Sequence, residues 1–174
     1  MKNIFITLSI FLSTCAFAQV AIGKATVNTS VSLEFYDNAD NVRGIVLPWV
    51  TSTAAVIGAV NGTIVYNTAD RKVYVKYASG WRDLSVDNTG TVTTTLQDSL
   101  TDQDTAKVLI GGDPSTDTTP GILVLADTNK AMVLPKVASP HLNIVNPSPG
   151  MMVYDTTKKQ LAVFNGTVWS FWKP

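Results

Sequence analysis

The sequence predicts an all-β protein made of two tandem modules, and three observations support this. A stretch from Gly62 to Trp81 returns, with changed letters, from Gly150 to Trp169. Both stretches contain runs of β-branched and aromatic residues broken by turn-forming residues. No segment has the apolar spacing of a long amphipathic helix, and Glu34 is the only glutamate. We therefore expect hairpin modules, β-meanders of short antiparallel strands, joined by a Thr-rich extended linker.

The first 18 residues have the pattern of a secretory signal peptide. A short basic start precedes the apolar run Ile4–Phe17, and Ala16-Phe17-Ala18 forms a small-x-small cleavage site. The apolar run is short for a membrane span. The alternative is a lipoprotein signal with Cys15 as the lipidated residue, although Thr14 replaces the usual small residue before it. We expect cleavage after Ala18 and export to the periplasm, the outer cell surface or the extracellular space.

The mature chain excludes several classes of function. Cys15 is the only cysteine, so cleavage leaves no disulfide and no thiolate chemistry. With 13 basic and 13 acidic residues, the chain lacks the positive charge that nucleic-acid binding needs. No later apolar run is long enough to span a membrane as a helix.

The first module, residues 19–85, begins with short strands and ends with the hairpin. The predicted early strands are Val20–Gly23, Ser32–Tyr36 and Arg43–Leu47. Pro48 ends the third because proline donates no ladder hydrogen bond. Thr51–Val60 could be a short helix or a loop.

Period-two alternation places one apolar face on the hairpin. In the first copy Ile64 and Tyr66 share a face, as do Val73 and Val75. The second copy keeps that face apolar with the equivalent residues Met152, Tyr154, Leu161 and Val163. Trp81 and Trp169 also recur at equivalent positions, which predicts core packing for both.

The second module, residues 107–174, repeats the first at an offset near 88 residues. Residues 86–106 form the predicted linker, in which Thr91–Leu96 has strand-like composition. Ser139–Asn146 aligns with Thr51–Val60 and contains Pro140, so we expect no helix there.

These residues resemble a module common in secreted surface proteins of Gram-negative bacteria and in tail-fibre-like proteins. The resemblance is carried by the two Leu-Pro pairs, by Val-Tyr-Asn-Thr and Val-Tyr-Asp-Thr in the hairpins, and by the two terminal tryptophans. The chain departs from the usual Pro-Arg, having Pro48-Trp49 and Pro135-Lys136. The resemblance implies a surface, fibre-like or adhesin-like role and a homo-oligomer, with a trimer as one form.

Three aromatic residues are the candidate contact residues for a ligand or a subunit. Trp49 and Trp172 occur in one copy each, and Phe171 precedes Trp172 near the C-terminus. Aromatic side chains at exposed positions serve protein contacts, and they also stack on sugar rings. A carbohydrate-binding module is therefore the alternative to a structural protein.

Catalytic and metal chemistry is not legible in the sequence. His141 is the only histidine and reads as a surface loop residue rather than a base. Asp102 with Asp104, and Asp113 with Asp117, offer oxygen ligands for calcium without the EF-hand spacing. We expect no cofactor and no enzyme activity. The predicted function is that of an exported structural or adhesin-like interaction protein, whose partner is itself, another surface protein or a glycan.

Overall fold

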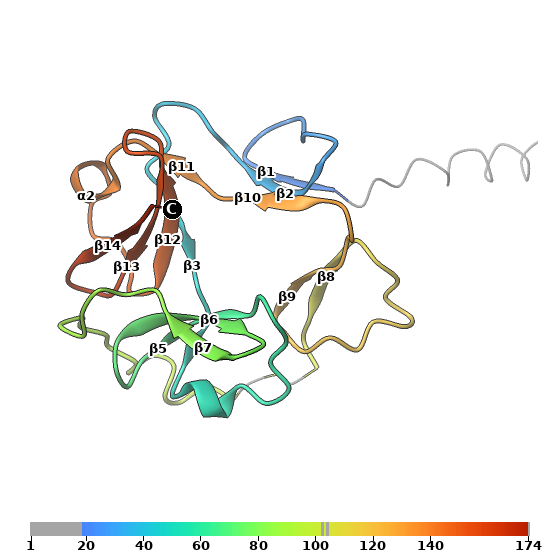
Figure 1. The fold of residues 1–174 in the computed structure, drawn as a ribbon, viewed down its shortest axis with the longest axis horizontal. Coiled ribbons are helices and arrows are strands. Elements are labelled where there is room, and N and C mark those ends of the chain that lie inside the picture. The colour runs from blue at the N-terminus through green and yellow to red at the C-terminus, as the bar shows by residue number, and fades with distance from the viewer. Residues whose placement is uncertain (1–18, 102, 104, 174) are drawn as a thin grey trace, which may run out of the picture.

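The computed structural model describes residues 19–173 apart from 102 and 104, and its fold is nearly all β (Figure 1). The predicted signal peptide lies outside the described residues, as do Asp102 and Asp104. Within the described part, no helix has the length and apolar character needed to cross a membrane.

The strands follow the two predicted repeats. Those of the first repeat are β1 (Val20–Ile22), β2 (Val31–Phe35), β3 (Ile45–Val46), β4 (Trp49–Val50), β5 (Ile64–Asn67), β6 (Lys72–Tyr77) and β7 (Gly80–Asp83). Those of the second are β8 (Val108–Ile110), β9 (Leu123–Leu125), β10 (Ala131–Val133), β11 (Lys136–Val137), β12 (Met151–Asp155), β13 (Gln160–Phe164) and β14 (Trp169–Trp172).

Both hairpins form as predicted. The antiparallel ladders β5–β6–β7 and β12–β13–β14 keep equivalent registers, with Ile64 opposite Val75 and Met152 opposite Val163. The remaining pairs are not all antiparallel. Five pairs run parallel, namely β1 with β2, β8 with β9, β4 with β5, β11 with β12 and β10 with β2. They can do so because the chain between the partners is long enough to return to the same end of the sheet.

The two repeats share sheets. β10 of the second repeat adds to β2 of the first, giving the order β1-β2-β10. β3 of the first repeat pairs with β12 of the second. Figure 1 shows the four sheets around the periphery of the molecule, with the two hairpins next to each other and β8–β9 apart from them. Each repeat thus supplies a strand to the other.

One apolar cluster holds the two hairpin faces together. Its buried residues come from both repeats and are Leu47, Tyr66, Val73, Leu84, Met152 and Val163. Ile64, Val75 and Leu161 pack against it, so the face predicted from alternation is the inner face in both copies. Tyr154, the fourth predicted residue of the second copy, is the exception: it is exposed.

A second, smaller cluster covers the outer face of the second hairpin. It consists of Val137, Ile144, Val153 and Ala162, with Met151, Trp169 and Phe171 against it. Trp169 therefore packs as predicted. Trp81 is half-buried and lines a shallow groove at the β6–β7 turn, and it belongs to neither cluster.

The predicted absence of a helix in residues 139–146 is wrong. Pro140–Asn143 forms a one-turn helix, α2, in which proline occupies the first turn, where its missing N–H is not needed. In the first repeat the aligned segment contains only the short 3-10 helix η2 (Thr53–Ala55), capped by the Ser52 side chain.

The segment between the repeats is docked rather than strand-forming. Thr91–Leu96 contains no strand, although its composition favours one. Val92 packs against the first cluster. The Thr91 hydroxyl donates to the Gly166 carbonyl at 3.0 Å, so the start of the predicted linker lies against the β13–β14 turn.

Candidate interaction surface

Trp49 lies between the two repeats. β4 holds it beside Tyr66, with 6.2 Å between the ring centroids. Its Nε1 donates to the Pro149 carbonyl at 2.9 Å, and the side chain is half-buried against the first cluster. The described contacts of Trp49 are therefore with both repeats of the same chain.

Trp172 and Phe171 point to opposite faces of β14, as neighbours in a strand must. Trp172 packs against the first cluster, donates from Nε1 to the Leu84 carbonyl, and has the Arg82 guanidinium 5.4 Å from its ring centroid. Phe171 packs against the second cluster and meets His141 edge-on at 5.7 Å. All three candidate aromatics are half-buried. A role for them in sugar or subunit binding stays a prediction.

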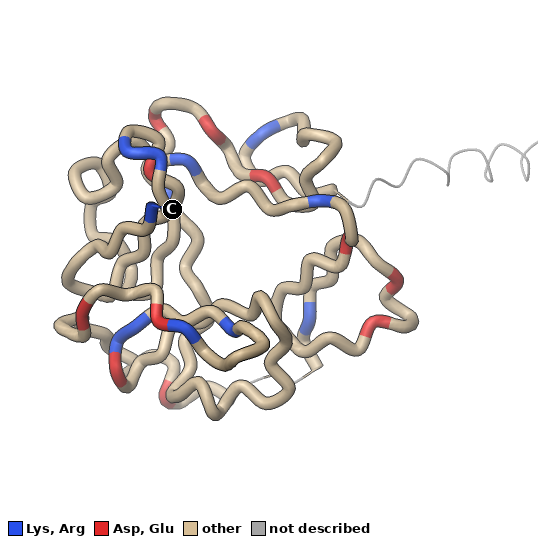
Figure 2. Tube along the Cα trace, viewed as in Figure 1, with Lys and Arg blue, Asp and Glu red and all other residues tan. Residues whose placement is uncertain are grey.

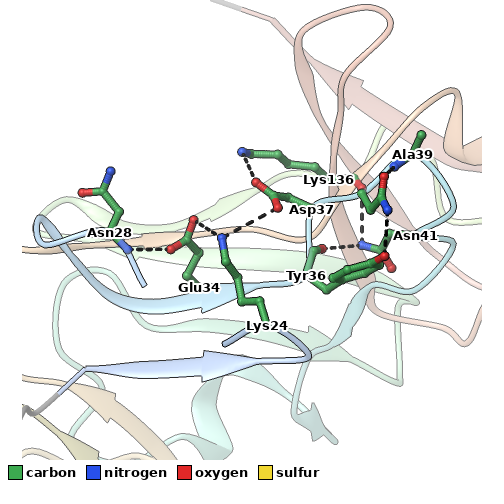
Figure 3. A network of polar contacts seen from close by, with 9 residues as sticks. Lys24, Asn28, Glu34, Tyr36, Asp37, Ala39, Asn41 and Lys136 are labelled. Carbon is green, nitrogen blue, oxygen red and sulfur yellow. Dashed lines mark hydrogen bonds and ion pairs between the residues drawn. The ribbon is translucent and has the colours of Figure 1, made fainter. Parts of the chain in front are cut away.

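A polar network ties the loops of the first repeat to the second (Figure 3). Glu34 accepts from the Asn28 N–H at 2.8 Å and from Lys24 Nζ at 2.9 Å. Asp37 pairs with Lys136 at 3.3 Å and with Lys24 at 3.7 Å. The backbone bond from Asn28 holds the pKa of Glu34 below its usual range, and the bond from Lys136 does the same for Asp37. Ionised side chains therefore link the loop after β1, strand β2 and the loop after β2 to β11.

A buried polar joint connects the hairpins directly. The Tyr66 hydroxyl donates to the Asn165 carbonyl at 2.7 Å, and burial raises the pKa of Tyr66 to about 12. The Asn165 side chain accepts from Thr167 and Val168 and donates to Asp87 at 2.8 Å. Tyr66 therefore acts as a neutral donor that sets the distance between the two repeats.

Other charged groups pair within loops or, as Lys72 and Asp83 do, between the neighbouring strands β6 and β7. Figure 2 shows basic and acidic residues interspersed over the described chain. Asp113 accepts from Ser115, and Asp117 pairs with Lys107 at 2.9 Å. His141 is exposed, as predicted, although it lies in α2. Within the described residues, no three His, Cys, Asp or Glu side chains gather closely enough to hold a metal ion.

β9 has an open sheet edge, which the sequence alone does not single out. β8 and β9 form a two-stranded sheet, whereas their equivalents β1 and β2 have β10 as a third strand. Leu33 in β2 is 2% exposed, but its equivalent Leu123 in β9 is 47% exposed. Tyr66 is 0% exposed and Tyr154 36%. The repeat in the sequence carries this information, because equivalent apolar residues should have equivalent neighbours. Leu123 and Tyr154 lack the neighbours that bury Leu33 and Tyr66.

Comparison with known proteins gives one match. Residues 113–173 match the family model described as a phage tail like trimerisation region. These residues include β9 to β14, and hence the open edge and Tyr154. No curated protein and no solved structure matches significantly.

Proposed function

We propose that the chain is a non-enzymatic structural protein of tail-fibre-like type that assembles into a homotrimer. The observation that carries this is the match of residues 113–173 to a trimerisation region. The open edge at β9 and the exposed Tyr154 lie within the same residues, and they give that region unsatisfied surface to bury. The proposal includes export through residues 1–18 and an adhesin-like role at the cell surface.

The test is the solution mass of the protein. Light scattering behind a sizing column should give three times the 18.7 kDa of one chain, less the signal peptide where it is cleaved. The mass should fall on dilution, because association follows mass action. A monomer at every accessible concentration would rule the proposal out.

A further inference from the structure

Two strand pairs connect the first repeat to the second, and each involves the strand that precedes a Leu-Pro pair. The strand that is followed by Leu-Pro is β3 in the first repeat and β10 in the second. β10 pairs with β2 of the preceding repeat, and β3 pairs with β12 of the following repeat. Each of these two pairings occurs once within a chain. The equivalent pairings, of β3 with β9 and of β10 with β5, are not made within the chain.

The first unmade pair is at β9. β2 accepts β10 with Met132 opposite Leu33 and Val133 opposite Glu34. The equivalent strands are β9 and β3, which would place Ile45 opposite Leu123 and Val46 opposite Val124. The bonds to β8 use the Ile122 carbonyl and the Ala126 N–H. Strand alternation then directs the polar backbone groups of Leu123 toward the open edge.

The second unmade pair is at the start of β5. β12 meets β3 with Met151 opposite Val46, and the Leu47 N–H donates to the Gly150 carbonyl at 3.1 Å. The equivalent contact would place Thr63 opposite Val133 and let Leu134 donate to Gly62. β5 begins at Ile64, one residue later than the equivalent start of β12. The residue by which β5 is shorter, Thr63, is the one that the partner strand would pair with.

Both unmade pairs join the second repeat of one chain to the first repeat of another. We infer that two copies associate head to tail, with β3 of one copy on β9 of its neighbour and β10 of that neighbour on β5. This inference rests on the proposed self-association and names its interface. The contact uses different surfaces on the two copies, so it closes as a ring, as the proposed trimer requires, or continues as a fibre.

The packing of one glycine supports this arrangement. A Cβ at Gly150 would lie 2.8 Å from the Tyr66 Cβ, so the two residues are in close contact across the repeats. The equivalent Gly62 has nothing within 4 Å of that position. Its counterpart Tyr154 is the exposed tyrosine. The inferred interface brings Gly62 of one copy onto Tyr154 of the next, which buries the side chain that the single chain leaves exposed.

A change of size at the same contact also fits. A Cβ at Gly44 would come within 2.7 Å of Met151 Cγ, so the pair inside the chain is a glycine against a long side chain. The inferred pair between copies is Ala131 against Thr63. Thr63 is smaller than Met151 and leaves room for the Ala131 methyl on that side, whereas Val65, the equivalent of Val153, stays a valine and has to shift.

Cysteine bridging tests the register. In full chains carrying Cys15→Ser, one tagged population has Thr63→Cys and a differently tagged population has Val133→Cys. Strand partners lie within disulfide range, so oxidation of the mixed proteins should join the two tags. Val46→Cys with Met151→Cys in one chain is the matched control. It should bridge within the chain, while Val133→Cys with the exposed Leu142→Cys should not bridge.

The outcomes separate the two proposals. A trimeric mass with bridging between Thr63→Cys and Val133→Cys supports both. A trimeric mass without that bridge leaves trimerisation standing and overturns the interface. A monomer overturns both.

Tyr154→Ala provides an independent arm. It should raise the concentration at which half of the chains dissociate by about tenfold or more, since a buried interfacial tyrosine is lost. Leu142→Ala should leave that concentration unchanged, and circular dichroism should show both variants folded. An unchanged dissociation concentration for Tyr154→Ala would contradict the interface.

Discussion

At the scale of single residues, buried polar groups join the parts of this fold that sequence periodicity does not connect. Glu34 is the only glutamate, and it is buried in the middle of β2. A buried carboxylate is tolerated because a backbone N–H and a lysine satisfy it. A sequence pattern of strands alone would count Glu34 as a surface residue.

Glu34→Gln should lower stability at neutral pH and flatten its dependence on pH. The pKa of Glu34 is lowered on folding, so its stabilisation is complete above the unfolded value of about 4.5 and is lost as the pH falls through the folded value. The variant should cost about 1 to 2 kcal/mol at pH 7, or about 2 to 8 °C in Tm. Thermal melts between pH 3 and 7 measure both effects. The exposed Asp40→Asn is the control, and parallel curves for Glu34→Gln and the native protein would contradict the prediction.

At the scale of elements, the short β3 strand depends on a glycine for its approach to β12. Gly44→Ala would place its Cβ 2.6 Å from Val153 Cγ1 and 3.0 Å from the Met152 carbonyl. Neither neighbour can move cheaply, so the variant should destabilise the chain by about 1 to 3 kcal/mol in urea unfolding. Adding Met151→Thr copies the Ala131 and Thr63 combination and should recover part of the loss. Met151→Thr alone is the control, and an unaffected Gly44→Ala would show that β3 does not approach β12 this closely.

The elements also show which parts of the fold the sequence could predict. Alternation of apolar residues and the repeated turns specify the hairpins, because those contacts are local. The parallel pairs of β10 with β2 and of β11 with β12 depend on long loops, and no local pattern encodes them. The sequence does not predict α2, because a proline inside a helix breaks it, whereas Pro140 stands at a helix start.

The candidate site was predicted less completely than the fold. Trp49 and Trp172 are candidates because they are unique to their copies, and the structure places both against the cluster between the repeats. Its equivalence with Tyr66 places Tyr154 on the apolar face, yet its side chain is exposed. A repeat predicts the same environment only where both copies have the same neighbours, and the end of a repeat array lacks one neighbour.

At the scale of the whole molecule, the shared sheets should make the two repeats unfold together. Val73 in the first repeat and Val163 in the second are both fully buried in one cluster, and each repeat lends a strand to the other. Neither repeat keeps its core when the other is lost, so a single cooperative transition is expected. Val73→Ala should therefore lower hydrogen-exchange protection in β12 and β13 as much as in β5 and β6.

Peptide-resolved hydrogen exchange in urea, at one fixed protein concentration, measures this coupling. The protection of both hairpins should fall by the same free energy, about 1 to 3 kcal/mol for a buried valine truncated to alanine. The exposed Val86→Ala is the matched control and should change neither hairpin. Loss of protection confined to β5 and β6 would mean that the repeats fold separately. The strands exchanged between them would then contribute little to stability, because the second repeat would keep its own structure without the first.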